Sequence, residues 1–176
     1  MSSADLSPKR LLVVLSLLAA ALPLSGCLQP MYGPLSENGN VAGELQAIAI
    51  EPIPDRIGHY LGNELHFAFN GTGSQVPPKY RLIITVRETV QTPLIDTVGG
   101  RASAGTVLIN ADYRLMPAGG GEPITKGSAF VAASYDRTSQ RFANLRAARD
   151  AEIRDAKTLA DQIRTRIAAS FGTRGS

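Results

Sequence analysis

The chain has 176 residues, a formal net charge of +3 at pH 7, 44% hydrophobic residues and a single cysteine. Its charges are too evenly balanced to indicate a nucleic-acid-binding protein, which usually carries a strong basic surplus. One cysteine cannot form an internal disulfide, so the chain is expected to fold without disulfide support.

The first 26 residues have the composition of a secretory signal peptide. Lys9 and Arg10 precede an apolar run of twelve residues, 11–22, in which Ser16 is the only polar member. A membrane-spanning helix needs roughly 20 such residues, so the run is too short to span a bilayer. Pro23 then ends the run, as expected ahead of a cleavage site.

The next four residues, Leu24-Ser25-Gly26-Cys27, resemble a lipobox, the recognition site of the lipoprotein signal peptidase. The resemblance implies cleavage after Gly26 and acylation of Cys27. A triacylated cysteine would hold the protein durably on a membrane, whereas one acyl chain binds only reversibly. Leu28 stands where many lipoproteins retained at the inner membrane have Asp, so export to the outer membrane is expected. The alternative is an uncleaved anchor with a chance cysteine, which the short apolar run disfavours.

The mature chain would comprise 150 residues, enough for one domain with a sizeable core. It would contain 16 Lys and Arg, 13 of them Arg, against 14 Asp and Glu. Arg is the better residue for bidentate contacts with phosphates and carboxylates. The sequence divides into a signal peptide over 1–26, a lipidated tether over 27–43 and one domain over 44–172.

The first part of the mature chain predicts a tether, a strand and a helix. Leu28–Gly43 is rich in Pro, Gly, Asn and Ser, as expected of a tether. Leu45–Glu51 alternates and predicts a strand. Asp55 is placed to cap a helix over 56–69, where apolar residues recur at helical spacing, and Gly71 is placed to end it.

The middle of the chain predicts three more strands. Tyr80–Arg87 alternates clearly, and Thr89–Gly105 follows as a long connection of the kind that is often functional. Thr106–Leu115 also alternates, with its apolar residues at odd numbers. Pro117–Pro123 contains three consecutive glycines and predicts a hairpin tip, after which Ile124–Tyr135 predicts an Ala- and Ser-rich fourth strand.

The last segment predicts a long amphipathic helix over 140–170, which Gly172 ends. Asp150 and Arg154 are spaced to form an ion pair on its solvated face. The complete order is β-α-β-β-β-α. It predicts an α+β fold in which two helices cover one face of a four-stranded mixed sheet, giving a two-layer domain.

Several motifs resemble the LptE family of lipopolysaccharide-assembly lipoproteins. The N-terminal and central motifs are Cys27 with Pro30-Met31-Tyr32-Gly33-Pro34-Leu35, Ile50-Glu51-Pro52-Ile53-Pro54-Asp55-Arg56-Ile57-Gly58 and Tyr80-Arg81-Leu82. The C-terminal motifs are Ser134-Tyr135-Asp136, Ala148-Arg149-Asp150-Ala151 and Leu159-Ala160-Asp161-Gln162-Ile163. The likeness covers nearly all of the mature chain. It implies two helices over a four-stranded sheet, in agreement with the order above.

The resemblance also implies a function and its partners. LptE acts as a plug inside the large outer-membrane β-barrel LptD, assists the folding of that barrel and binds lipopolysaccharide. The expected partners are therefore an LptD-type barrel, lipopolysaccharide and the outer membrane through the acyl chains, with no nucleic acid and no cofactor. A periplasm-facing carrier of lipid or lipoprotein, or a pilot lipoprotein of a secretion channel, is the alternative.

Five residues are candidates for these contacts. Lipopolysaccharide is anionic, so Arg87 and Arg101, which flank the long connection, and then Lys126 near the opposite hairpin are the candidate ligand-binding residues. The alternative is that they are solvated charges at strand ends. Leu94 and Ile95 are apolar residues within the long connection and are candidate contacts with the barrel; the alternative is a loop packed on its own core.

Catalysis finds little support in the sequence. His59 and His66 lie seven residues apart on one predicted helix, two turns from each other and too far to chelate a metal unaided. No motif of a serine hydrolase, zinc protease or phosphate-binding loop occurs. The sequence therefore predicts a protein that is not an enzyme and binds no metal, and an envelope hydrolase is disfavoured.

Overall fold

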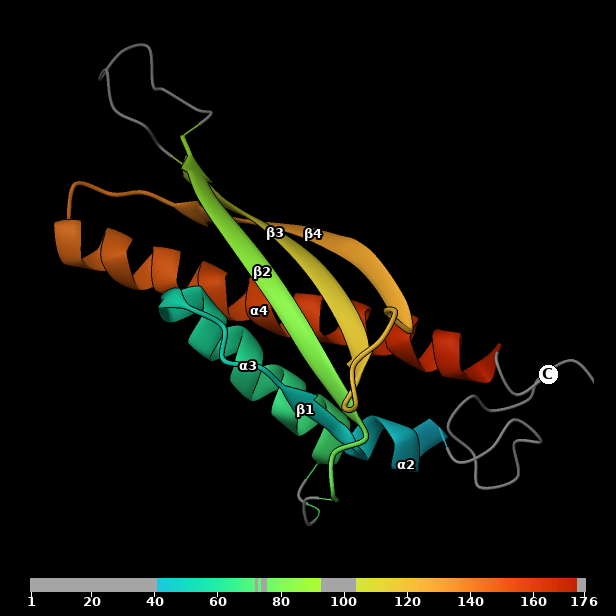
Figure 1. The fold of residues 1–176 in the computed structure, drawn as a ribbon. Coiled ribbons are helices and arrows are strands. Elements are labelled where there is room, and N and C mark those ends of the chain that lie inside the picture. Colours follow the sequence, from blue (N-terminus) through green and yellow to red (C-terminus); the bar gives the residue numbers. More distant parts are fainter. Residues whose placement is uncertain (1–40, 72, 74–75, 93–103, 174–176) are drawn as a thin grey trace, which may run out of the picture.

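The computed structural model describes residues 41–71, 73, 76–92 and 104–173 (Figure 1). In chain order, its helices and strands are α2 (Val41–Gln46), β1 (Ile48–Ile50), α3 (Asp55–Asn70), β2 (Tyr80–Gln91), β3 (Ala104–Pro117), β4 (Thr125–Asp136) and α4 (Arg141–Gly172).

The strands form one mixed sheet in the order β1-β2-β3-β4. β1 runs parallel to β2, with Ile48 opposite Tyr80, and the other two pairings are antiparallel. The predicted fold class is therefore confirmed. Because β1 has only three residues, it pairs with the first quarter of β2, and the rest of that β2 edge has no strand neighbour among the described residues.

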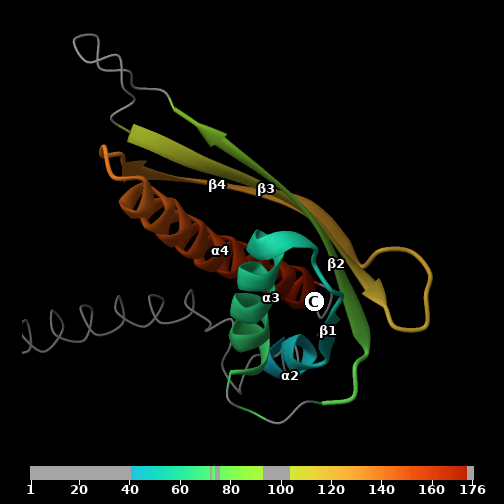
Figure 2. The same ribbon diagram turned by 90° about the vertical axis from the view of Figure 1, so that its left-hand side faces the viewer.

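The three helices of the described residues lie on one side of the curved sheet (Figure 2). Odd-numbered residues of β3 and the apolar residues of α3 and α4 meet there, in a core with almost no exposed surface. The largest fully buried side chains are Leu45, Leu61, Leu65, Leu82, Val107, Ile109, Leu115, Leu159, Ile163 and Ile167. No described element covers the other face of the sheet.

A short helix, α2, occupies the end of the predicted tether and the start of the predicted first strand, so the prediction of a strand over Leu45–Glu51 was wrong at its beginning. Val41 and Leu45 are four residues apart, which places both on one side of a helix, and both are buried. Glu44 on α2 accepts hydrogen bonds from Lys79 Nζ at 2.9 Å and Tyr80 Oη at 2.7 Å. These contacts tie α2 to the start of β2.

Helix α3 starts at a tight turn. The residue before it is Pro54, and no side chain caps the helix, so the predicted capping role of Asp55 was wrong. Asp55 instead is the first helical residue and has a φ of 68°, a region that Asp tolerates better than most residues. Gly58 lets the turn fold back, since a Cβ there would lie 2.6 Å from the Ile53 carbonyl oxygen. At the other end, the Gly71 N–H bonds to the Phe67 carbonyl at 2.8 Å, as predicted for the stop.

The hairpin of β2 and β3 is longer than predicted. Thr89, Val90 and Gln91 pair with Leu108, Val107 and Thr106 respectively. The connection therefore begins after Gln91 and ends before Ala104, whereas the sequence predicted Thr89–Gly105. Cross-strand pairing adds residues to both strands that alternation alone did not include.

Helix α4 has 32 residues and runs the length of the domain (Figure 1). The predicted ion pair between Asp150 and Arg154 is present on its exposed side. Within the described part of the chain, none of the helices is both long enough and apolar enough to cross a bilayer.

Candidate functional site

The uncovered face of the sheet carries a pair of neighbouring cations. Arg114 on β3 and Lys126 on β4 are directly opposite each other in the antiparallel register, and both are exposed. No ion pair joins either one to a carboxylate among the described residues. Like charges in directly opposed positions repel, so an anion placed between them would be stabilising. Of the predicted ligand residues, Lys126 therefore has the surroundings that best suit an anion.

Arg87 is in different surroundings on the same face. Its Nη1 lies 3.3 Å from Asp112 Oδ2, and both side chains are largely exposed. Arg87 and Lys126 are two strands and four residues apart, which corresponds to about 16 Å. The structure thus does not bring these two predicted residues together at one phosphate. Arg81, near the start of β2, is also paired: its Nη1 lies 3.1 Å from Glu51 Oε1.

The other predicted site residues lie outside the described residues. These are Cys27, Leu94, Ile95 and Arg101. Their proposed roles therefore remain predictions from the sequence.

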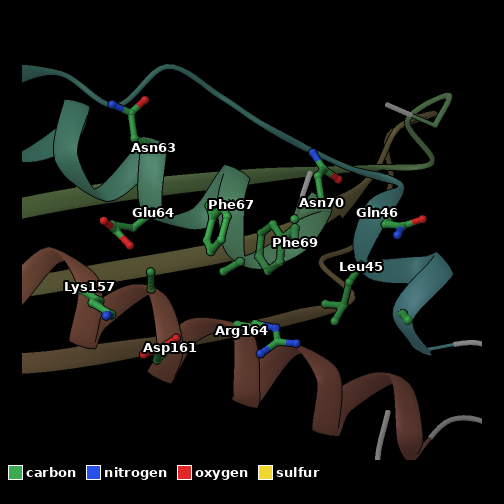
Figure 3. Close-up of a pocket in the computed structure, with 14 residues that line it drawn as sticks. Leu45, Gln46, Asn63, Glu64, Phe67, Phe69, Asn70, Lys157, Asp161 and Arg164 are labelled. Carbon is green, nitrogen blue, oxygen red and sulfur yellow. The ribbon is translucent and has the colours of Figure 1, made fainter. Parts of the chain in front are cut away.

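A groove of about 690 Å³ separates α2, α3 and α4 (Figure 3). The residues that line it include the acidic Glu64 on α3 and Asp161 on α4 and the basic Lys157 on α4. Phe67 on α3 is 66% exposed beside these charges. A lipid carrier needs a deep apolar cavity, and this groove with its mixed charges does not supply one.

A charged cluster lies beneath the sheet, near the start of α3. Arg56 donates to both carboxylate oxygens of Glu152 on α4, at 2.8 Å and 2.5 Å. The Glu152 side chain is 4% exposed, whereas that of Arg56 is 54% exposed. Such a bidentate pair is among the stronger ion-pair geometries.

Two further carboxyl groups belong to this cluster. Burial raises the pKa of Glu88, and the charge of Glu152 raises it further, although Arg56 opposes the shift. Burial also raises the pKa of Asp155 to about 6, against the lowering effects of a backbone hydrogen bond from Ala133 and of Arg154. Asp155 Oδ2 has no hydrogen-bond partner among the described residues. Arg56 therefore faces both Glu152 and Glu88, Arg154 lies near Asp155, and the pKa values of Glu88 and Asp155 are raised.

The sequence reasoning missed this cluster, although one signal was available. Glu152 and Asp155 are buried with Ala151, Ala156 and Leu159 on the core side of α4. Two acids on an apolar helix face indicate a buried polar contact. Only the fold shows that Arg56, 96 residues away from Glu152 in sequence, provides the partner.

We expect Asp155→Asn to stabilise the domain by about 2 kcal/mol at pH 7.5 and to have little effect near pH 4. The folded-state pKa of about 6 lies above the ordinary value of 3.8. Relative to high pH, where Asp155 is charged, protonation of its carboxyl group stabilises the folded state. This stabilisation is complete below pH 3.8 and is lost as the pH rises through 6. Urea unfolding of both proteins across this range measures the effect. If the free energies of unfolding of the two proteins differed by the same amount at pH 4 and pH 7.5, the raised pKa of Asp155 would be contradicted.

The two histidines lie exposed on α3, and His59 contacts Asn63 at 3.2 Å. Among the residues that the structure describes, no group of three or more His, Cys, Asp or Glu side chains could hold a metal ion. The candidate functional features are therefore the neighbouring cations Arg114 and Lys126 on the sheet, the charged cluster and the exposed faces of the helices.

The arrangement defines a class: a two-layer α+β domain of the kind found in bacterial lipoproteins. The crystal structure of a candidate lipoprotein from Caulobacter crescentus CB15 has a TM-score of 0.63 and 24% identity, covering 76% of this chain and 97% of that chain. A minor lipoprotein from Acinetobacter baumannii has a TM-score of 0.51 and 16% identity, covering 69% and 90%. At these identities the likeness is one of fold.

The family follows from the sequence. The family model of LptE, described as lipopolysaccharide-assembly, matches residues 45–167. The chain therefore belongs to the LptE family, which consists of non-enzymatic, envelope-associated lipoproteins. No curated protein matches the sequence.

Proposed function

We propose that this protein is an outer-membrane lipoprotein, anchored through acyl chains on Cys27, that acts as the plug and assembly factor of an LptD-type β-barrel. In this role it assists the insertion of lipopolysaccharide into the outer leaflet. The observation that carries the proposal is the family match over residues 45–167, which includes almost the whole folded domain from β1 to α4.

The uncovered sheet face suits a plug. Its central positions include hydroxyl, amide and charged groups, at Thr85, Asn110, Asp112 and Ser128, beside the exposed Phe130. The interior of an outer-membrane barrel is polar, and such groups can form hydrogen bonds with it. Leu94 and Ile95 would add apolar contacts with the barrel wall.

Lipopolysaccharide would bind at cationic positions. Lys126 is the first of these, because Arg114 lies opposite it and the two can share one phosphate. Arg87 and Arg101 complete the proposed set, and Arg87 would have to exchange its exposed contact with Asp112 for the ligand. An exposed ion pair contributes little stability, so this exchange costs little.

Affinity purification of the C-terminally tagged full-length protein from detergent-solubilised outer membranes tests the proposal. We expect a large β-barrel to co-purify in equal amount, because a plug and its barrel form one stable unit. Mass spectrometry of the same sample would show acyl chains on Cys27. Recovery of the lipoprotein alone, or with a secretin ring, would contradict the plug role and favour the carrier or pilot function.

A further inference from the structure

The N-terminal third of α4 extends beyond the rest of the helical layer. Arg56, in the first turn of α3, pairs with Glu152, so α3 begins level with that residue of α4. From 141 to 150, no residue of α4 is buried, whereas buried residues recur from Ala151 onwards. The ribbon shows this end of α4 running past α3 (Figure 1).

This projecting segment and the turn that follows it expose apolar side chains on one face. Phe142 is 81% exposed, Leu145 is 59% exposed and Ile153 is 42% exposed. Their spacing places them on one side of the helix. They line a hollow of about 920 Å³ with Arg146, Arg149 and Asp150. The apolar residues are therefore gathered in one patch.

The same segment has an unbalanced charge. Arg141, Arg146 and Arg149 form no ion pair among the described residues, and Asp150 is already paired with Arg154. No acid lies in the first turn of α4, where an acid would favour the helix dipole and where Arg141 opposes it. These arginines therefore have no carboxylate partner among the described residues.

The start of the segment is held in place. The Thr138 N–H donates to Asn144 Oδ1 at 2.8 Å, and Asn144 Nδ2 donates back to the Thr138 carbonyl at 2.8 Å. This reciprocal contact fixes the first turn of α4 to the chain that leads into it. The patch is thus presented on an ordered helix.

Exposed apolar side chains among arginines match the chemistry of an anionic lipid surface. In an interfacial helix, the apolar side chains enter the boundary of the acyl layer, while arginine side chains reach the phosphates above it. Arginine also binds phosphate in a bidentate manner. An acidic protein surface would account for the arginines but would leave Phe142 and Leu145 without apolar surroundings.

We propose that the N-terminal third of α4, with the turn that follows it, docks on the surface of a bilayer that contains anionic phospholipid. Phe142, Leu145 and Ile153 would lie in the interface, and Arg146 and Arg149 at the phosphates. This contact would be separate from the Cys27 anchor and from the barrel. It would give the domain a second attachment to the membrane and fix its orientation there.

A fluorescence measurement on the full chain tests this contact. An environment-sensitive fluorophore is attached at Leu145→Cys, and in a second protein at Thr158→Cys, which is exposed on another face of α4. Each protein is reconstituted in vesicles of phosphatidylcholine alone or with phosphatidylglycerol. The chain without an introduced cysteine is labelled in parallel to give the background from Cys27.

We expect the probe at position 145, and not at 158, to shift to the blue and to be quenched by lipid-borne quenchers when phosphatidylglycerol is present. Arg146→Gln with Arg149→Gln should weaken the docking equilibrium by about thirtyfold, the ratio for two charges near an anionic surface. Lys157→Gln with Arg166→Gln is the matched control, with the same change in net charge on the other half of α4, and should have a much smaller effect.

Several results would overturn the proposal. One is a probe at position 145 that does not respond to phosphatidylglycerol, or that responds equally in neutral vesicles. Another is equal weakening of the docking equilibrium by both double variants. A response to lipopolysaccharide micelles without any response to phosphatidylglycerol vesicles would also overturn it. Because no barrel is present in the assay, failure here leaves the co-purification test of the plug role unaffected.

Discussion

Replacing Arg56 with alanine is expected to lower the free energy of unfolding by about 2 to 3 kcal/mol at pH 7. The change removes both hydrogen bonds to Glu152, whose side chain is 4% exposed, and leaves a buried carboxylate near Glu88 and Asp155. The effect should fall below the range for a fully buried pair, because the Arg56 side chain is 54% exposed. Urea unfolding at pH 7 measures it.

The double variant Arg56→Ala with Glu152→Gln separates the loss of charge pairing from the loss of packing. It removes both charges and should be within about 1 kcal/mol of the natural protein, since a buried pair often contributes little when both partners are replaced. A loss for Arg56→Ala of less than about 0.5 kcal/mol would be typical of an ordinary surface residue and would contradict the role of the pair.

Gly58→Ala should destabilise the domain by about 2 kcal/mol, even though alanine is the better helix former. A Cβ at this position would lie 2.6 Å from the Ile53 carbonyl oxygen and 2.8 Å from its carbon, so the backbone of the turn must move. This turn leads into Arg56, and its displacement should also weaken the pair with Glu152. Thermal and urea unfolding of the variant give the magnitude.

Gly62→Ala is the matched control on the same helix. A Cβ at Gly62 would have no neighbour within 4 Å, so the substitution should stabilise α3 by up to about 1 kcal/mol. Opposite signs for the two substitutions are the expected result. If Gly58→Ala were as stable as Gly62→Ala, the close approach of the turn to the helix would not be a constraint.

The fold was largely predictable because its signals are local. Alternation in β2 and β3 and helical spacing in α3 and α4 gave the order of elements and the covered face. The prediction failed at α2, where a six-residue segment with two buried positions fits a helix or a strand equally well. It also shortened β2, because Thr89 to Gln91 are strand residues only through their pairing with β3.

The candidate site was less predictable because its contacts are distant in sequence. The pairing of Lys126 with Arg114 depends on the register of β3 and β4, and the pairing of Arg56 with Glu152 depends on how α3 crosses α4. Composition showed a surplus of arginine but could not say which arginines have acidic neighbours. The sequence ranked Arg87 ahead of Lys126, and only the structure shows that Arg87 has the Asp112 carboxylate beside it.

The position of α4 after all four strands in sequence has a consequence for the order of folding. The β2, β3 and β4 hairpins can form as soon as residue 136 is available, because their partners are close in sequence. Until α4 has been made, however, the inner face of the sheet, with Val107, Ile109 and Leu115, lacks the longest helix that packs on it. A chain that emerges from its N-terminus would thus pass through a stage with a complete sheet and an exposed apolar face, which is prone to aggregation. Chaperones that shield apolar surface would be needed most during the interval in which α4, Arg141–Gly172, emerges.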